Sequence, residues 1–224
     1  MVKLKERIAC IIPARSGSKR IKNKNLTKIN NKHLIEFVFN KILKSKTIDD
    51  FYLATDKKII YNKIGRLKNK VKFFHRSKKS SSSQAKSELV IQEFLSIYKN
   101  YEIIIFVQAT NPFINYLYLD EAIKKFISKK YDSMLSVAYS KNFLWSKKFP
   151  HKPINYNFKN RKMSQSLKGY FVENGSFYIF YRKNFLKFKN RLHKKIGIYE
   201  MPKETIFEID DYDDLDIVKK LLKK

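Results

Sequence analysis

Cysteine and long apolar runs are scarce in this chain, and each shortage excludes a class of protein. The 224 residues include one cysteine, Cys10, so neither a disulfide framework nor a zinc site is expected. No stretch stays apolar over the ~18 residues that a membrane span needs. Pro13 ends the first apolar run too early for a signal peptide. We therefore expect a soluble, cytoplasmic protein with no membrane partner.

Acidic residues are also few, and the imbalance raises the question of a nucleic-acid partner. The chain has 20 Asp and Glu against 49 Lys and Arg, a formal net charge of +29. Eight of the 49 cations are Arg and 41 are Lys, whereas proteins that read bases and phosphates favour the planar guanidinium. Because the Lys residues are spread over the whole chain, we expect no nucleic-acid partner. The charge can still steer polyanionic substrates toward the protein.

The apolar pattern predicts one α/β domain over residues 1–224. The chain is 43% hydrophobic and long enough to bury a full core. Short β-branched runs alternate with helical periodicity, which indicates a mostly parallel sheet with helices on both faces. Asp56 is a candidate N-cap for the second helix. Strands are predicted at 8–12, 51–54, 71–74, 103–107, 133–138, 175–181 and 196–201. Helices are predicted at 34–43, 57–67, 89–98, 117–127 and 212–222.

The alternation breaks between about residues 140 and 173. This stretch is rich in aromatic residues, Lys and Asn and has no clean period. An irregular segment of such length in a compact domain is usually a substrate lid, a dimer arm or a flexible insertion.

The first predicted strand ends in a loop that is suited to phosphate binding. Residues 8–26 read IACIIPARSGSKRIKNKNL, an apolar run followed by a Ser-Gly-Ser turn among cations. Backbone N–H groups of such a turn point into a concavity, and the cations neutralise an anion held there. The loop has neither the GxxxxGK[ST] pattern nor GxGxxG. It therefore predicts a nucleoside triphosphate site of another kind.

Three further segments follow the loop in order: FVQATNP at 106–112, FVENGSFYIF at 171–180 and EIDDYDDLDIVKKLL at 208–222. With residues 8–26, they resemble the cytidylyltransferases that activate nonulosonic acids, the CMP-sialic acid synthetase family with its legionaminic and pseudaminic acid relatives. The resemblance runs nearly from end to end. It implies a Rossmann-like α/β fold, a homodimer, Mg²⁺, and transfer of CMP from CTP to an acid sugar with release of pyrophosphate. It also implies that the insertion at 140–173 serves dimerisation and substrate binding.

The resemblance assigns roles within the phosphate loop. Arg15 and Lys19 would neutralise the β- and γ-phosphates, and Lys24 would stabilise charge on the α-phosphate and the leaving oxygen. Arg20 and Lys22 stand where the family commonly has Gly and Pro. The predicted nucleotide-binding residues are Ala14, Arg15, Ser16, Gly17, Ser18, Lys19, Lys24, Asn25, Arg76 and Ser83. Asp56 either touches the nucleotide or caps the following helix.

The C-terminal acidic segment predicts the metal site. Glu208 and Asp210 occupy the two positions of the family's Asp-x-Asp pattern, and residues two apart in an extended segment point to the same side. Mg²⁺ needs only one or two protein carboxylates. The acids at 211, 213 and 214 are expected to cap the final helix instead.

Five residues are predicted to contact the sugar: Gln108, Asn111, Asn174, Arg161 and Gln165. Asn174 and Gly175 are also expected to form a tight turn into a strand. The family meets the sugar carboxylate with a cation near 161–165, where this chain has Met163 and Ser164. Lys147, Lys148 and Lys168 are the alternatives, and the sequence does not choose among them.

Three other functions stay open at the level of the sequence. A related enzyme could activate a different acid sugar or an alditol phosphate, although a phosphorylated acceptor needs an additional anion site. The departures at Ala109, Met163, Ser164 and Glu208 also fit a homologue that has lost catalysis. The net charge leaves a nucleic-acid binder as the candidate from another class.

Overall fold

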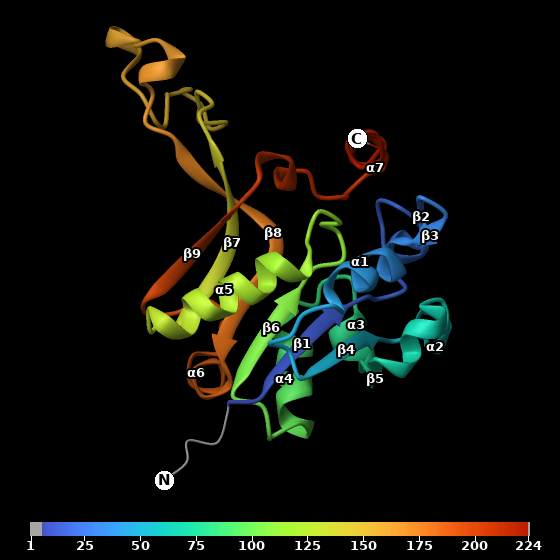
Figure 1. Cartoon of the computed structure of the whole chain (residues 1–224). Coiled ribbons are helices and arrows are strands. Elements are labelled where there is room, and N and C mark those ends of the chain that lie inside the picture. Colours follow the sequence, from blue (N-terminus) through green and yellow to red (C-terminus); the bar gives the residue numbers. More distant parts are fainter. Residues whose placement is uncertain (1–5, 224) are drawn as a thin grey trace.

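The computed structural model describes residues 6–223, and within them seven strands form one sheet (Figure 1). The strands are β1 (Ile8–Pro13), β4 (Asp50–Thr55), β5 (Val71–His75), β6 (Ile103–Val107), β7 (Ser133–Ser140), β8 (Tyr170–Tyr181) and β9 (Ile196–Met201). They lie in the order β5-β4-β1-β6-β8-β7-β9. Strands β5, β4, β1 and β6 pair in parallel, β8 is antiparallel to both of its neighbours, and β9 is parallel to β7. The predicted mostly parallel α/β sheet is confirmed.

Helices cover both faces of the sheet, as the continuous apolar strands require. Alternate residues of β1 enter different cores: Cys10 and Ile12 lie in one, Ala9 and Ile11 in the other. The first core is closed by α1 (Leu34–Ile42), α5 (Tyr116–Ser128) and α7 (Tyr212–Leu221). The second is closed by α4 (Ser87–Ile97) and α6 (Arg182–Phe188).

Several short elements lie outside the sequence-based prediction. They are α3 (Lys78–Ser81), the hairpin β2 (Lys28–Ile29) and β3 (Lys32–His33), and the 3₁₀ turns η1 (Lys24–Leu26), η3 (Phe158–Asn160), η4 (Ser164–Ser166) and η5 (Lys203–Ile206). The helix predicted at 57–67 is instead α2 (Lys58–Asn62) followed by η2 (Gly65–Asn69). Gly65, the first residue of η2, has φ +56°, a left-handed conformation that glycine adopts readily.

Strand β8 begins earlier than the sequence pattern indicates. Asn174 and Gly175 lie inside it and do not form a turn before it, which corrects that prediction. The pairing with β7 jumps from Leu135–Tyr178 to Val137–Glu173, so β8 bulges between these pairs. Gly175 has φ +60°, which supplies the left-handed residue that the bulge needs.

Between β7 and β8 the chain forms an arm, which we define as residues 141–169. It contains η3, η4 and one isolated bridge between Trp145 and Pro153, and otherwise lacks regular structure, as the sequence predicts. Figure 1 shows it extending away from the sheet beyond the ends of β7 and β8. Its large apolar side chains face solvent, with Phe149 82% exposed. The others are Trp145, Ile154, Phe158 and Met163.

None of the helices formed by residues 6–223 is both long enough and apolar enough to cross a bilayer. The parallel strands place three loops at one edge of the sheet. Those after β1, β4 and β6 all leave from the carboxyl ends of their strands, the edge where α/β sheets bind ligands. The loops at this edge of the sheet form the candidate functional site.

Candidate active site

A cleft of about 440 Å³ opens at the carboxyl edge of β1 and β4. Five of its lining side chains are cations and one, among the described residues, is a carboxylate. Such a lining attracts a ligand that carries several negative charges. The lining residues are Pro13, Arg15, Ser18, Lys19, Arg20, Lys24, Asn25, Arg76, Ser83, Ala85, Ser87, Val90, Thr110 and Asp210.

The loop after β1 is held in place by groups from two neighbouring segments. Ser16 donates to Asp56 through both its backbone N–H, at 2.8 Å, and its hydroxyl, at 2.6 Å. Asn25 donates to the Arg15 carbonyl at 3.0 Å, which folds the loop back on itself. Burial raises the pKa of Asp56, but the Ser16 hydrogen bonds and the charge of Arg76 outweigh it and lower the pKa overall. Asp56 is therefore a charged anchor for the loop.

These contacts separate the ten predicted nucleotide-binding residues into two groups. Seven line the cleft: Arg15, Ser18, Lys19, Lys24, Asn25, Arg76 and Ser83. Three do not: Ala14, which is buried and bonded to β4, Ser16, which is bound to Asp56, and Gly17. The expectation that Asp56 caps a helix is wrong, because Lys57 occupies the N-cap of α2.

One wall of the cleft is a serine-rich turn that is held by hydrogen bonds to charged side chains. Arg76 is 6% exposed and donates to the Ser80 carbonyl, and Arg15 donates to the Ser82 carbonyl at 2.7 Å. Glu93 of α4 accepts hydrogen bonds from the hydroxyls of Ser77 and Ser80. Sequence reasoning missed Glu93. Ser77 caps α3 by accepting from the Ser80 N–H, which leaves its O–H as a donor, but the acceptor lies 16 positions away and has no local signal.

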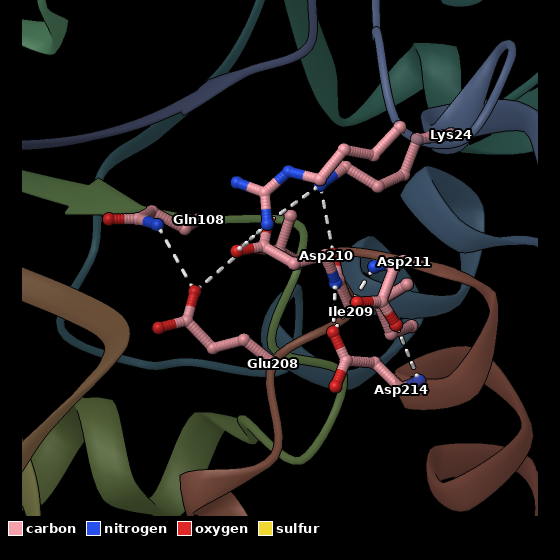
Figure 2. Close-up of polar contacts among 9 residues, drawn as sticks. Lys24, Gln108, Glu208, Ile209, Asp210, Asp211 and Asp214 are labelled. Atoms are coloured by element: carbon pink, nitrogen blue, oxygen red, sulfur yellow. Dashed lines mark hydrogen bonds and ion pairs between the residues drawn. The ribbon is translucent and has the colours of Figure 1, made fainter.

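The opposite wall brings together two segments that lie far apart in the sequence (Figure 2). Lys24 Nζ donates to the Ile209 carbonyl at 2.9 Å and contacts Asp210 Oδ1 at 3.1 Å. Arg20 Nη1 contacts the other oxygen of the same carboxylate, Asp210 Oδ2, at 3.0 Å. The side chain of Lys24 is 15% exposed and that of Asp210 is 46% exposed. Lys24 is therefore fixed in place, while the Asp210 carboxylate faces the cleft.

The segment that carries Asp210 is fixed by the cap of α7. Asp211 accepts from the Asp214 N–H at 3.0 Å, and Asp214 Oδ2 accepts from the N–H groups of Asp210, at 2.9 Å, and Asp211, at 3.1 Å. This capping box confirms the prediction that Asp211 and Asp214 cap the final helix.

Glu208 lies beside Asp210 in a different environment. It accepts from Thr110 Oγ1 at 3.2 Å and Gln108 Nε2 at 3.4 Å (Figure 2). Burial raises the pKa of Glu208 to about 7, and the charge of Asp210 contributes to the rise. The hydrogen bond from Thr110 lowers the pKa but does not cancel this effect. Gly175 makes this position possible, because a Cβ there would lie 2.2 Å from Glu208 Oε1.

Asn111 and Asn174 form a buried network behind the cleft. Asn111 Nδ2 donates to the carbonyls of Asn174 and Thr205, each at 2.7 Å. Asn174 Nδ2 donates to Thr205 Oγ1 at 2.8 Å, and its Oδ1 accepts from Ser136 at 2.6 Å. Both asparagines are 0% exposed. They therefore cannot touch a substrate from these positions, which corrects the prediction of direct contact. Their amides instead fix the segment that precedes Glu208.

The remaining predicted sugar contacts are divided between the cleft and the arm. Gln108 stands beside the cleft, hydrogen-bonded to Glu208. Arg161 and Gln165 lie on the arm, where the Arg161 guanidinium covers the ring of Phe143 at 4.3 Å. Within one chain neither residue lines the cleft, and the arm that carries them extends away from the sheet (Figure 1).

The charge distribution limits which ions the site can hold. Among residues 6–223, no group of three His, Cys, Asp or Glu side chains is arranged around a common metal position. Glu208 and Asp210 are two neighbouring carboxylates with hard oxygen donors, which suit an ion that keeps most of its water. Arg20 and Lys24 of the loop contact Asp210 directly, and Arg15 and Lys19 line the same cleft.

A parallel α/β sheet with a cation-lined cleft beyond its first strand is the architecture of a nucleotide-binding protein. The model of the cytidylyltransferase family matches residues 9–224, and the chain belongs to that family.

The chain is similar to curated members of the family. It is 29% identical to pseudaminic acid cytidylyltransferase of Campylobacter jejuni over 96% of this chain and 95% of that protein. It is 31% identical to N-acylneuraminate cytidylyltransferase B of Danio rerio over 90% of this chain and 48% of that protein. The chain thus spans about half the length of the N-acylneuraminate cytidylyltransferases that it matches.

Solved structures share the fold. A CMP:2-keto-3-deoxy-manno-octonic acid synthetase in complex with CTP superposes with a TM-score of 0.72 at 14% identity, covering 97% of this chain and 99% of that one. A 4-diphosphocytidyl-2C-methyl-D-erythritol synthase of Anaerococcus prevotii gives 0.67, also at 14% identity, over 98% and 100% of the chains.

The contact between Gly175 and Glu208 predicts the effect of adding one methyl group. Gly175→Ala forces a side chain into a φ of +60° and into the space of the carboxylate. We expect the free energy of unfolding, measured by urea denaturation, to fall by about 1–2 kcal/mol. Gly17→Ala is the matched control, because a Cβ at Gly17 meets nothing within 4 Å, and it should leave the value unchanged. Equal stability of the two variants would contradict the assignment.

Proposed function

We propose that this chain transfers CMP from CTP to the anomeric hydroxyl of a nonulosonic acid and releases pyrophosphate. The observation that carries the proposal is the position of Lys24, which bridges the phosphate loop and the acidic segment 186 positions away. Lys24 is held in this position by hydrogen bonds, between the proposed triphosphate site and the carboxylate pair. Membership of the cytidylyltransferase family supports CTP as the nucleotide. The names of the curated relatives support an acid sugar as the acceptor.

The cleft residues divide the work of phosphoryl transfer by position. Arg15 and Lys19 hold the β- and γ-phosphates, and Lys24 stabilises charge on the α-phosphate and the oxygen that leaves. The anomeric oxygen attacks the α-phosphorus, its proton is lost, and the bond from that phosphorus to pyrophosphate breaks. Because nucleotidyl transfer depends mostly on position and charge, rigid cations supply much of the catalysis.

The carboxylate pair fits Mg²⁺. Burial together with the neighbouring charge of Asp210 raises the pKa of Glu208 to about 7, so a cation bound beside Glu208 would stabilise its charged form. Asp210, half-exposed toward the cleft, would hold the ion, and Glu208 would be the second ligand. When bound, Mg²⁺ supplies positive charge to the phosphate oxygens.

The arm supports a homodimer. Its exposed apolar side chains, Phe149 and Trp145 among them, would be covered by a second copy. Arg161 and Gln165 lie on the same arm, so a dimer is also the arrangement in which they would reach a cleft.

The experiment that tests the function measures pyrophosphate released from CTP and Mg²⁺ in the presence of single acceptors. We expect release with at least one of N-acetylneuraminic, legionaminic or pseudaminic acid. 2-Keto-3-deoxy-manno-octonic acid tests another acid sugar, and 2-C-methylerythritol 4-phosphate tests a phosphorylated alditol. Release with only one of these last two would reassign the substrate. Release with none would indicate a homologue without catalysis.

Lys24→Ala should lower kcat by about 100-fold or more, the usual cost of removing a group that stabilises developing charge. Lys22→Ala is the matched control, since Lys22 is an exposed cation of the same loop that does not line the cleft. Circular dichroism verifies that both variants fold. A Lys24→Ala rate within threefold of the unmodified protein would contradict the role given to Lys24.

Asp210→Asn should weaken Mg²⁺ binding, measured by calorimetry in the presence of CTP, and lower pyrophosphate release in parallel. EDTA should abolish release by the unmodified protein, and added Mg²⁺ should restore it. Asp213→Asn removes an equal charge from the exposed start of α7 and should leave both quantities unchanged. If the two variants bind Mg²⁺ equally, Asp210 is not a ligand.

A further inference from the structure

The chemistry of the proposed acceptor restricts where its carboxylate can lie. In a nonulosonic acid the carboxylate carbon is bonded directly to the anomeric carbon, whose hydroxyl attacks the α-phosphorus. The carboxylate must therefore lie within a few bonds of the reacting atoms. The cation that binds this carboxylate must therefore lie beside Lys24. Lys24 contacts Asp210, which lines the cleft.

The cations of the arm do not meet this condition within one chain. Lys168 lines a separate hollow of the arm with Phe143 and Tyr156, and Lys147 and Lys148 precede the exposed Phe149. The arm leaves the sheet at the carboxyl end of β7 and extends beyond it (Figure 1). Within one chain, none of the three lysines that the sequence offered as partners of the carboxylate lines the cleft.

Most cations of the cleft are already held on the side of the nucleotide. Arg15 is bonded to the Ser82 carbonyl, and Arg76 is buried against the Ser80 carbonyl. Lys24 is bonded to the Ile209 carbonyl and to Asp210. Lys19 contacts none of the acidic segment and belongs with the phosphates.

Arg20 lies in the required position and has free N–H donors. Its side chain is 64% exposed and lines the cleft, and Nη1 contacts Asp210 Oδ2 at 3.0 Å. Among the described residues, the polar partner of Arg20 is Asp210. Most of the five guanidinium N–H groups of Arg20 are therefore free. A guanidinium matches a carboxylate with two parallel hydrogen bonds.

The acidic groups nearby make such a cation necessary. Glu208 lies beside Asp210, and the charges of Asp210 and Glu173 both act on it. An incoming carboxylate would be repelled by these groups unless a positive charge were placed between them. Arg20 is already located there, against Asp210.

We infer that Arg20 binds the carboxylate of the acid sugar and so selects a 2-keto acid over an uncharged acceptor. This inference rests on the proposed function and specifies the substrate class of the same site. It places substrate choice in the phosphate loop itself, one residue after the triphosphate ligand Lys19.

The test compares Arg20→Ala, Arg20→Lys and the control Lys22→Ala. The substrates are the best accepted of N-acetylneuraminic, legionaminic and pseudaminic acid, and the C1 carboxamide of that same sugar. For Arg20→Ala we expect KM for the acid to rise about 30-fold, the range of a charge-assisted hydrogen bond, with KM for CTP within threefold. Arg20→Lys should recover part of the loss. With the carboxamide, Arg20→Ala and the unmodified protein should have equal KM values.

Two results would overturn the inference while leaving the enzyme in place. One is a rise in KM for the acid no larger than that of Lys22→Ala. The other is an equal loss with acid and carboxamide, which would indicate a structural role for Arg20. If the unmodified protein neither binds nor converts any of the three acids, the proposed function fails, and the inference fails with it. Binding of each acid by calorimetry, with CTP absent, separates these cases.

Discussion

Lys24, in the loop after the first strand, contacts Ile209 and Asp210, in the segment just before the last helix. The cleft exists because this loop and this segment meet. Each side has its own support. On the N-terminal side, Asp56 holds Ser16 by two hydrogen bonds. On the C-terminal side, the cap of α7 fixes the backbone around Asp210. Without this ion pair the carboxylates and the phosphate loop would have no fixed separation, and a nucleotide could not bridge them.

The two halves of the cleft differ in rigidity, and the difference matches their tasks. The nucleotide side is built from buried or tied groups such as Arg76 and Glu93, because desolvated charges are stable only when they are paired or hydrogen-bonded. The side of the cleft that we propose for the acceptor has Arg20, whose side chain is mostly exposed. A family that uses one nucleotide with many acceptors gains from this arrangement, since the acceptor side can vary while the cations stay in place.

The sequence predicted the sheet and the order of its main elements well, because these depend on local periodicity and on residues close together in the chain. It was wrong about Asp56, Asn111 and Asn174. Each of these polar residues follows a strand or sits in a turn-like motif, and its partner lies far away in sequence, as Ser16 and Thr205 do. Local rules offered a cap or a ligand for them. Burial instead required that every amide find a protein partner.

The sequence by itself determined the fold class, the cytidylyltransferase family and the chemistry of the first loop, since apolar spacing and clustered cations carry that information directly. Tertiary structure decided which cations face the cleft and which are structural. It paired Arg20 and Lys24 with Asp210, placed Glu208 against Gly175, and left the arm's lysines out of the lining of the cleft. The physical reason is that a charge acts over a few ångströms, and the folded chain sets those distances between residues that are nearly two hundred positions apart.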